Sequence, residues 1–140
     1  MKEFEDMLVP NDAQPKLHGF DSMVSNQTMG KFSFVSEKLN LFVAEHQKLG
    51  GLVGRTLLTS LPEKIILFNS AFLDWLLENP QYIPESWKGK FTFFAGTVFM
   101  KNGVEVIRYL YFGLNGWASF YRWLDRGFHE NSPVGYLEAA

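Results

Sequence analysis

The chain has 140 residues, 46% of them hydrophobic, with 13 Lys and Arg against 15 Asp and Glu and no cysteine. The hydrophobic content excludes disorder over most of the chain, and the lack of cysteine excludes a disulfide scaffold and a cysteine-ligated zinc site. The length predicts one compact domain, and a net charge of −2 gives no global attraction to nucleic acid or to a membrane.

Aromatic residues are abundant, with 14 Phe, 5 Tyr and 4 Trp, and the charge is unevenly distributed. Residues 1–30 hold two lysines against five acids, whereas residues 88–126 hold six cations against two acids. The aromatic-rich part of the chain is therefore its basic part.

Targeting signals are not expected. The start of the chain is acidic where a signal peptide requires an apolar run. The longest uncharged apolar stretches, at 65–73, 91–100 and 109–121, are shorter than the roughly 18 residues that a membrane span needs. The sequence therefore predicts a cytoplasmic protein without membrane contact.

The N-terminal part of the chain is expected to be irregular. Residues 1–30 show no clear hydrophobic period and predict an irregular arm, with a brief strand after it at 32–34. A helix is predicted over 36–49, because it opens on a serine cap, repeats apolar residues at helical spacing and is followed by two glycines. Residues 52–58 predict a short strand or an extended connector.

A second helical segment is predicted from residue 60 to residue 79. A serine and a glutamate at its start have capping-box spacing, and a proline follows its end. The segment is apolar nearly all round, so it should be buried, with Trp75 in the core. An N-cap at Asn69 offers an alternative, a strand over 64–68 followed by a helix over 70–78.

Three β-rich runs follow at 91–100, 104–112 and 117–124. Each gap between them holds an Asn-Gly pair, the strongest short-range signal for a β-hairpin. If each Asn-Gly pair forms a two-residue turn, the register is fixed. It then places Arg108 opposite Trp123, and Tyr109 between Gly96 and Arg122.

The predicted fold is α+β, with two main helices followed by a three-stranded antiparallel meander packed on them. We expect a single domain over residues 1–140. Its parts are the irregular arm at 1–30, a helical part at 36–79, the antiparallel sheet at 88–126 and a C-terminal tail at 127–140. This order is compatible with a cone-like helix-on-curved-sheet domain that encloses an aromatic pocket, although that is a likeness of fold alone.

Candidate catalytic groups are few. His129, Glu130 and Asp125 form the one cluster with the composition of an acid–base site, in a segment that is typical of a surface loop. The sequence contains no metal-spaced pair of histidines, no Gly-x-Ser-x-Gly elbow and no phosphate-binding loop. It therefore predicts no metal and no cofactor, and it favours a non-catalytic protein over an enzyme.

A basic and aromatic run at 88–94 combines the cations and rings that RNA-binding strands use. The cations of this region lie mostly at or beyond the strand ends, which favours a core strand flanked by solvated lysines. Nucleic acid is therefore not an expected partner.

Both faces of the predicted meander carry aromatic residues, and two helices can cover only one of them well. The other face should be covered by the arm, by a second subunit or by a ligand. The candidate binding residues are Tyr109, Tyr111, Phe120 and Arg122 on one face, or Arg108, Tyr121 and Trp123 on the opposite face. The predicted function is a small non-catalytic protein–protein interaction module that uses one of these faces for self-association or for a protein partner. The alternative is a pocket protein, including an enzyme, that binds a small apolar or aromatic ligand.

Overall fold

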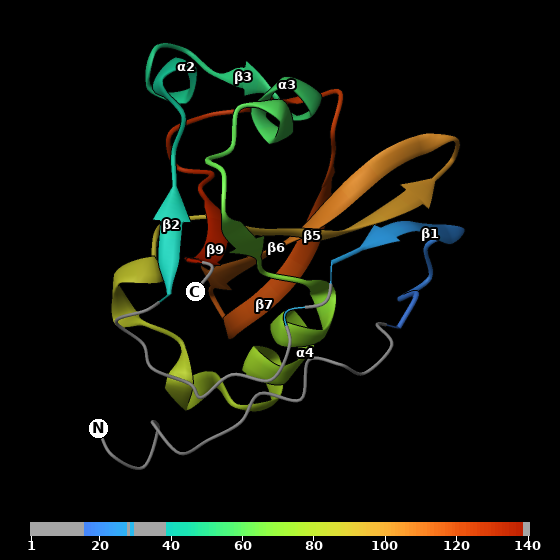
Figure 1. The fold of residues 1–140 in the computed structure, drawn as a ribbon. Helices are drawn as coiled ribbons and strands as arrows, with labels where there is room; N and C mark the ends of the chain where they lie inside the picture. The colour runs from blue at the N-terminus through green and yellow to red at the C-terminus, as the bar shows by residue number, and fades with distance from the viewer. Residues whose placement is uncertain (1–15, 28, 30–38, 139–140) are drawn as a thin grey trace.

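The computed structural model describes residues 16–27, 29 and 39–138, and its main feature is a mixed sheet of seven strands (Figure 1). Five strands follow the order β2-β9-β5-β6-β7, while β1 also pairs with β5 and β4 also pairs with β9. The bounds are β1 Ser22–Asn26, β2 Asn40–Phe42, β4 Ile65–Leu67, β5 Thr92–Lys101, β6 Val104–Gly113, β7 Gly116–Trp123 and β9 Val134–Glu138.

Short elements complete the described part of the fold. A two-stranded sheet joins β3 (Leu52–Val53) to β8 (Gly127–Phe128). The α-helices are α2 (Glu45–Lys48), α3 (Gly54–Thr59) and α4 (Ser70–Glu78). Two 3₁₀ turns, η2 (Pro80–Tyr82) and η3 (Glu85–Trp87), lead from α4 to β5.

The predicted architecture of two main helices and a three-stranded meander is wrong, because sheet dominates and only α4 exceeds six residues among the described helices. The helix predicted over 36–49 is replaced, where the structure describes it, by strand β2 and the four-residue helix α2. Strand β2 forms because it pairs antiparallel with β9, a partner that no local pattern reveals. The strand predicted at 32–34 lies outside the described residues.

The alternative interpretation of the next segment is confirmed, with strand β4 followed by helix α4. Asn69 caps this helix, since its side-chain oxygen accepts a 2.9 Å hydrogen bond from the backbone N–H of Phe72. Trp75 is 9% exposed, so its predicted place in the core is confirmed. The segment predicted as a strand or connector at 52–58 is extended only in β3 and then becomes α3.

The three long strands of the C-terminal half are confirmed, and so is the first Asn-Gly turn. Asn102 and Gly103 both have positive φ, at 52° and 78°. The second turn lies one residue earlier than predicted, because Gly113 pairs with Gly116. The β6–β7 register therefore shifts by two residues, which places Arg108 opposite Tyr121 instead of Trp123.

The predicted register of β5 against β6 holds only near the turn. Phe99 pairs with Val106, but Phe94 pairs with Arg108, so residues 95–98 of β5 bulge opposite a single residue of β6. Tyr109 consequently lies opposite Phe93 and Phe120, not Gly96 and Arg122.

The bulge arises where three segments meet at Gly96. Its N–H donates to the carbonyl of Phe68 at 2.8 Å, and its own carbonyl accepts from the N–H of Gln27 at 2.6 Å. A Cβ atom at this position would lie 2.8 Å from the carbonyl oxygens of Leu67 and Phe68. The backbones can approach this closely only because residue 96 is glycine.

Both faces of the sheet are covered. In Figure 1, α4 lies on one side, whereas α2, β3 and α3 lie together at the opposite end of the molecule. One buried cluster joins Phe72 of α4 to Phe94 and Leu110, and the other joins Leu57 of α3 to Phe93 and Ile107 on the other face. The expectation that the arm, a second subunit or a ligand covers the second face is therefore wrong for the centre of the sheet, where Leu57 of α3 and Phe128 of β8 cover it.

Part of the predicted arm belongs to the sheet. Strand β1 pairs with the second half of β5, and Phe20 just before it is buried against Phe99 and Val106. Residues 1–15 of the arm lie outside the described part. Within residues 16–27, 29 and 39–138, no helix has the length and apolar character that crossing a membrane requires.

Candidate functional site

Arg122 is enclosed by aromatic rings on the face that packs against β8. Its Cζ atom lies 5.0 Å from the ring centroids of Phe93 and Phe128 and 5.5 Å from that of Tyr109. Its Nη1 donates to the hydroxyl of Ser132 at 3.0 Å. Burial lowers the pKa of Arg122, while the tyrosine beside it opposes that shift. Cation–π contacts therefore hold Arg122 inside the fold.

Arg108 is bound on the opposite face, toward α4, and is 5% exposed. Its Nη1 donates to the hydroxyl of Ser70 at 2.6 Å and to the Asp74 carboxylate at 2.9 Å. Its Nη2 donates to the Ser119 hydroxyl at 3.1 Å. The second carboxylate oxygen of Asp74 lies 2.9 Å from Nε2 of His18, so Asp74 joins the segment before β1 to the sheet.

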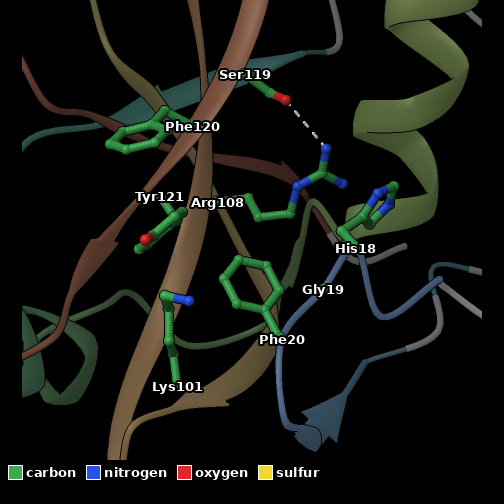
Figure 2. A pocket seen from close by; sticks show the side chains of 8 residues that line it. All are labelled: His18, Gly19, Phe20, Lys101, Arg108, Ser119, Phe120 and Tyr121. Atoms are coloured by element: carbon green, nitrogen blue, oxygen red, sulfur yellow. Dashed lines mark hydrogen bonds between the residues drawn. The ribbon is translucent and has the colours of Figure 1, made fainter.

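A pocket of about 250 Å³ opens beside this network, between the segment at 18–20 and strands β5, β6 and β7 (Figure 2). Its polar lining comes from the side chains of His18, Lys101, Arg108 and Ser119. Its aromatic lining comes from Phe20, Phe120 and Tyr121. Gly19, which lies between His18 and Phe20 in the chain, also lines it. The pocket thus combines cations with rings at one edge of the sheet.

The seven residues predicted as binding candidates divide between the two faces. Arg108, Phe120 and Tyr121 line the pocket, and Trp123 packs beside Tyr121 with 5.3 Å between ring centroids. Tyr109, Tyr111 and Arg122 lie on the opposite face, where the ring of Phe120 also meets that of Tyr109 with 6.3 Å between centroids. The two predicted groups of residues therefore lie on opposite faces of the sheet, as alternation along β6 and β7 placed them.

The pocket residues that sequence reasoning missed include His18, Phe20 and Lys101. The first two lie in the arm, where no hydrophobic period marks a position, although Gly19 between them has a φ of 84° and marks a turn. Lys101 directly precedes the Asn-Gly turn. A hairpin prediction could have placed it near Tyr121, but only with the correct β6–β7 register.

The predicted cluster of His129, Glu130 and Asp125 is not joined by any hydrogen bond or ion pair within the described residues. The imidazole of His129 instead packs on Gly51, where a Cβ atom would lie 2.8 Å from its Cε1. Its backbone carbonyl accepts a 3.0 Å hydrogen bond from Gln47. These contacts assign His129 a packing role.

The outer edge of β7 is the second candidate site, since no other described strand pairs with it. The N–H of Leu124 donates to the backbone carbonyl of Glu105 at 2.9 Å. This bond fixes which residues of β7 point their backbone groups toward β6 and which point them away. By that alternation, the N–H and C=O groups that point away from β6 belong to Trp117, Ser119, Tyr121 and Trp123.

Large apolar side chains are exposed around this edge. Phe120 in β7 is 55% exposed, Phe112 at the end of β6 is 42% exposed, and Leu114 in the turn is fully exposed. No residue of β7 is fully buried. Unpaired backbone groups beside exposed rings are typical of an edge that accepts another strand.

Comparison of the chain with protein-family models, with curated proteins and with solved structures found no match. Among the residues that the structure describes, no group of three or more His, Asp or Glu side chains is arranged to hold a metal ion. Function is therefore inferred from the geometry of the β7 edge and of the pocket.

Proposed function

We propose that this chain is a protein-interaction module whose working surface is the outer edge of β7, and that the strand it accepts is β7 of a second copy. The observation that carries the proposal is an eight-residue edge strand with its outward backbone groups unpaired by any other described strand. Soluble proteins usually block such an edge with lysine, proline or a covering segment. The sequence of β7 contains neither lysine nor proline.

The outward residues of β7 are arranged symmetrically, which favours a second copy as the partner. Ser119 and Tyr121 flank Phe120 on either side, and Trp117 and Trp123 lie at the next outward positions. A two-fold axis through Phe120 therefore pairs Ser119 with Tyr121 of the other copy, and Trp117 with Trp123. All four outward residues then gain backbone partners in one antiparallel ladder.

Charge does not oppose this arrangement. The one charged residue of β7, Arg122, is enclosed by rings on its own sheet, so two copies meet without like charges facing one another. The half-exposed rings of Phe120 would lie opposite each other across the axis, where cross-strand aromatic pairs stabilise a ladder. The interface is small, so the dimer should be concentration-dependent.

The test is static light scattering over a concentration series with two matched variants. The average mass of the wild type should rise from monomer toward dimer as concentration increases. Phe120→Lys places two like charges at the axis and should hold the protein as a monomer. Leu114→Lys adds the same charge at a fully exposed turn residue outside the proposed ladder and should leave the dimer unchanged.

Two results would contradict the proposal. One is a wild-type protein that stays monomeric across the whole series. The other is an equal effect of both lysine substitutions, which would show that charge in general, and not the β7 ladder, controls association. Thermal melting of both variants checks that each remains folded.

A further inference from the structure

The pocket beside β7 contains a guanidinium with donors to spare. Arg108 has five N–H donors, and its three hydrogen bonds to Ser70, Asp74 and Ser119 use three of them. Its Nε and one hydrogen of Nη2 have no acceptor among the residues that the structure describes. Since Arg108 lines the pocket, these spare donors are available to a ligand there.

A second cation points into the same space. Lys101 lines the pocket, and its Nζ lies 5.8 Å from the ring centroid of Tyr121 (Figure 2). It forms no ion pair with a described residue, while Glu105 nearby in the chain is paired with Arg55 at 3.5 Å. Asp21 accepts a 2.9 Å hydrogen bond from the N–H of Asn102. Neither carboxylate forms an ion pair with Lys101 within the described residues.

The two charged residues that line the pocket, Lys101 and Arg108, are both cations. Asp74 offsets the charge of Arg108 and also contacts His18, so the ammonium of Lys101 remains without a counter-ion in the described part of the chain. Coulomb attraction is strengthened where neighbouring rings exclude water, and Phe20 and Tyr121 stand 5.1 Å apart at the wall. The pocket therefore favours a negatively charged group.

The walls favour a flat apolar body attached to that group. Phe20 stacks on Phe99 at 4.7 Å and meets Tyr121 edge to face, so these rings are held in fixed orientations. Phe120 packs against Tyr121 with 4.6 Å between centroids. A volume of about 250 Å³ lies just below the range of pockets for drug-sized ligands, which limits the ligand to a small molecule.

We propose that this pocket binds a small organic carboxylate with a planar apolar body. Lys101 and the spare N–H groups of Arg108 donate hydrogen bonds to the carboxylate, since planar guanidinium groups match carboxylate oxygens in geometry. The rings of Phe20 and Tyr121 contact the planar body. Ser119 and Asp74 hold Arg108 in position and are positioning residues.

The experiment uses benzoate as the probe and isothermal titration calorimetry as the measurement, with the full chain. Benzoate should bind in the millimolar range, as expected for a ligand of this size, and benzamide, its neutral analogue, should bind at least tenfold more weakly. Lys101→Met should weaken benzoate about tenfold through loss of one charged partner. Lys48→Met makes the same change in α2, which contributes no residue to the pocket, and should have no effect.

Four results would overturn the proposal. Equal binding of benzoate and benzamide would mean that the charge is not recognised. Equal binding of benzoate and inorganic phosphate would mean that the rings take no part. Benzoate binding that survives Lys101→Met in a folded protein would place the ligand elsewhere, and no heat of binding from benzoate would leave the pocket without this function. Because Ser119, Phe120 and Tyr121 belong both to the pocket and to the proposed β7 ladder, the titration is repeated at two protein concentrations to separate ligand binding from dimer formation.

Discussion

Gln47 joins α2 to the loop that precedes β9 through two hydrogen bonds and caps its own helix through a third. Its Nε2 donates to the carbonyls of His129 and Ser132 at 3.0 and 2.9 Å, and its Oε1 accepts from the N–H of Ala44 at 2.7 Å. The side chain is 1% exposed. An amide is required because it alone offers one acceptor and two donors together.

Replacement of Gln47 by leucine should therefore be strongly destabilising. The change leaves the buried N–H of Ala44 and the carbonyl of Ser132 without this partner, while the His129 carbonyl keeps the N–H of Ser132, and the expected loss in the free energy of unfolding is about 3 kcal/mol. Urea denaturation monitored by tryptophan fluorescence measures it. His46→Leu, on the exposed side of the same helix, is the control and should change stability little. A loss equal to that of the control would mean that the three hydrogen bonds are replaced by water.

Tyr109 predicts a dependence of stability on alkaline pH. Burial raises its pKa above the ordinary value of 10.0, the charge of Arg122 lowers it in part, and Tyr111 adds to the rise. The folded protein therefore keeps the phenol proton longer than the unfolded chain does. This contribution to stability is fully present below pH 10.0 and is lost as pH rises above it.

The variant Tyr109→Phe should reduce that alkaline loss. We expect the free energy of unfolding to fall less between about pH 8 and about pH 11 in the variant than in the wild type. Tyr136→Phe removes one phenol from β9 and serves as the comparison. Identical pH profiles for the wild type and Tyr109→Phe would show that the phenol ionises equally in both states.

At the scale of the element, Gly96 is where β5 changes partners. The first half of β5 contacts β9, the second half contacts β1, and the backbone of β4 ends against the bulge between them. Gly96→Ala should destabilise the fold by about 1–3 kcal/mol, because its Cβ atom meets two backbone carbonyls that cannot move independently.

The comparison for Gly96→Ala is Gly127→Ala in β8, where the nearest atom to a new Cβ is Nε2 of His129 at 3.7 Å. Differential scanning calorimetry of both variants should give a lower melting temperature for Gly96→Ala alone. Similar melting temperatures would mean that β4 and β5 separate at little cost.

Elements with local signals were predictable from the sequence, and elements that depend on distant partners were not. The strands of the 91–124 region follow from alternation and Asn-Gly turns, and both kinds of signal lie within a few residues. Strand β2 exists because it pairs with β9 far along the chain, while its apolar residues fit a helical spacing equally well. The bulge at Gly96 depends likewise on β1 and β4.

The lining of the candidate pocket was predictable where its residues lie in strands with local signals. Arg108, Phe120 and Tyr121 stand out as a cation and rings inside strands, and all three line it. His18 and Phe20 could not be found, because their position depends on how the preceding segment packs across the sheet. The sides on which Phe93 and Phe94 point could not be found either, because the bulge in β5 reverses them.

At the scale of the whole molecule, the sheet is covered at its centre and open at one side. Helix α4 packs on one face, while α3 and β8 pack on the other. Edge strand β7 receives less cover, and it carries three of the residues that line the small pocket, Ser119, Phe120 and Tyr121. The proposed dimer and the proposed ligand therefore both use the side of the molecule where packing is incomplete.

Hydrogen exchange at the outward amides of β7 tests the proposed dimer most directly. The amides of Ser119 and Tyr121 have no strand partner within the described monomer, but they become paired in a ladder with a second copy. Their exchange should therefore be fast in dilute protein and should slow markedly as concentration rises, while Phe120→Lys keeps it fast throughout. Fast exchange of these amides in the wild type at every concentration would contradict the account.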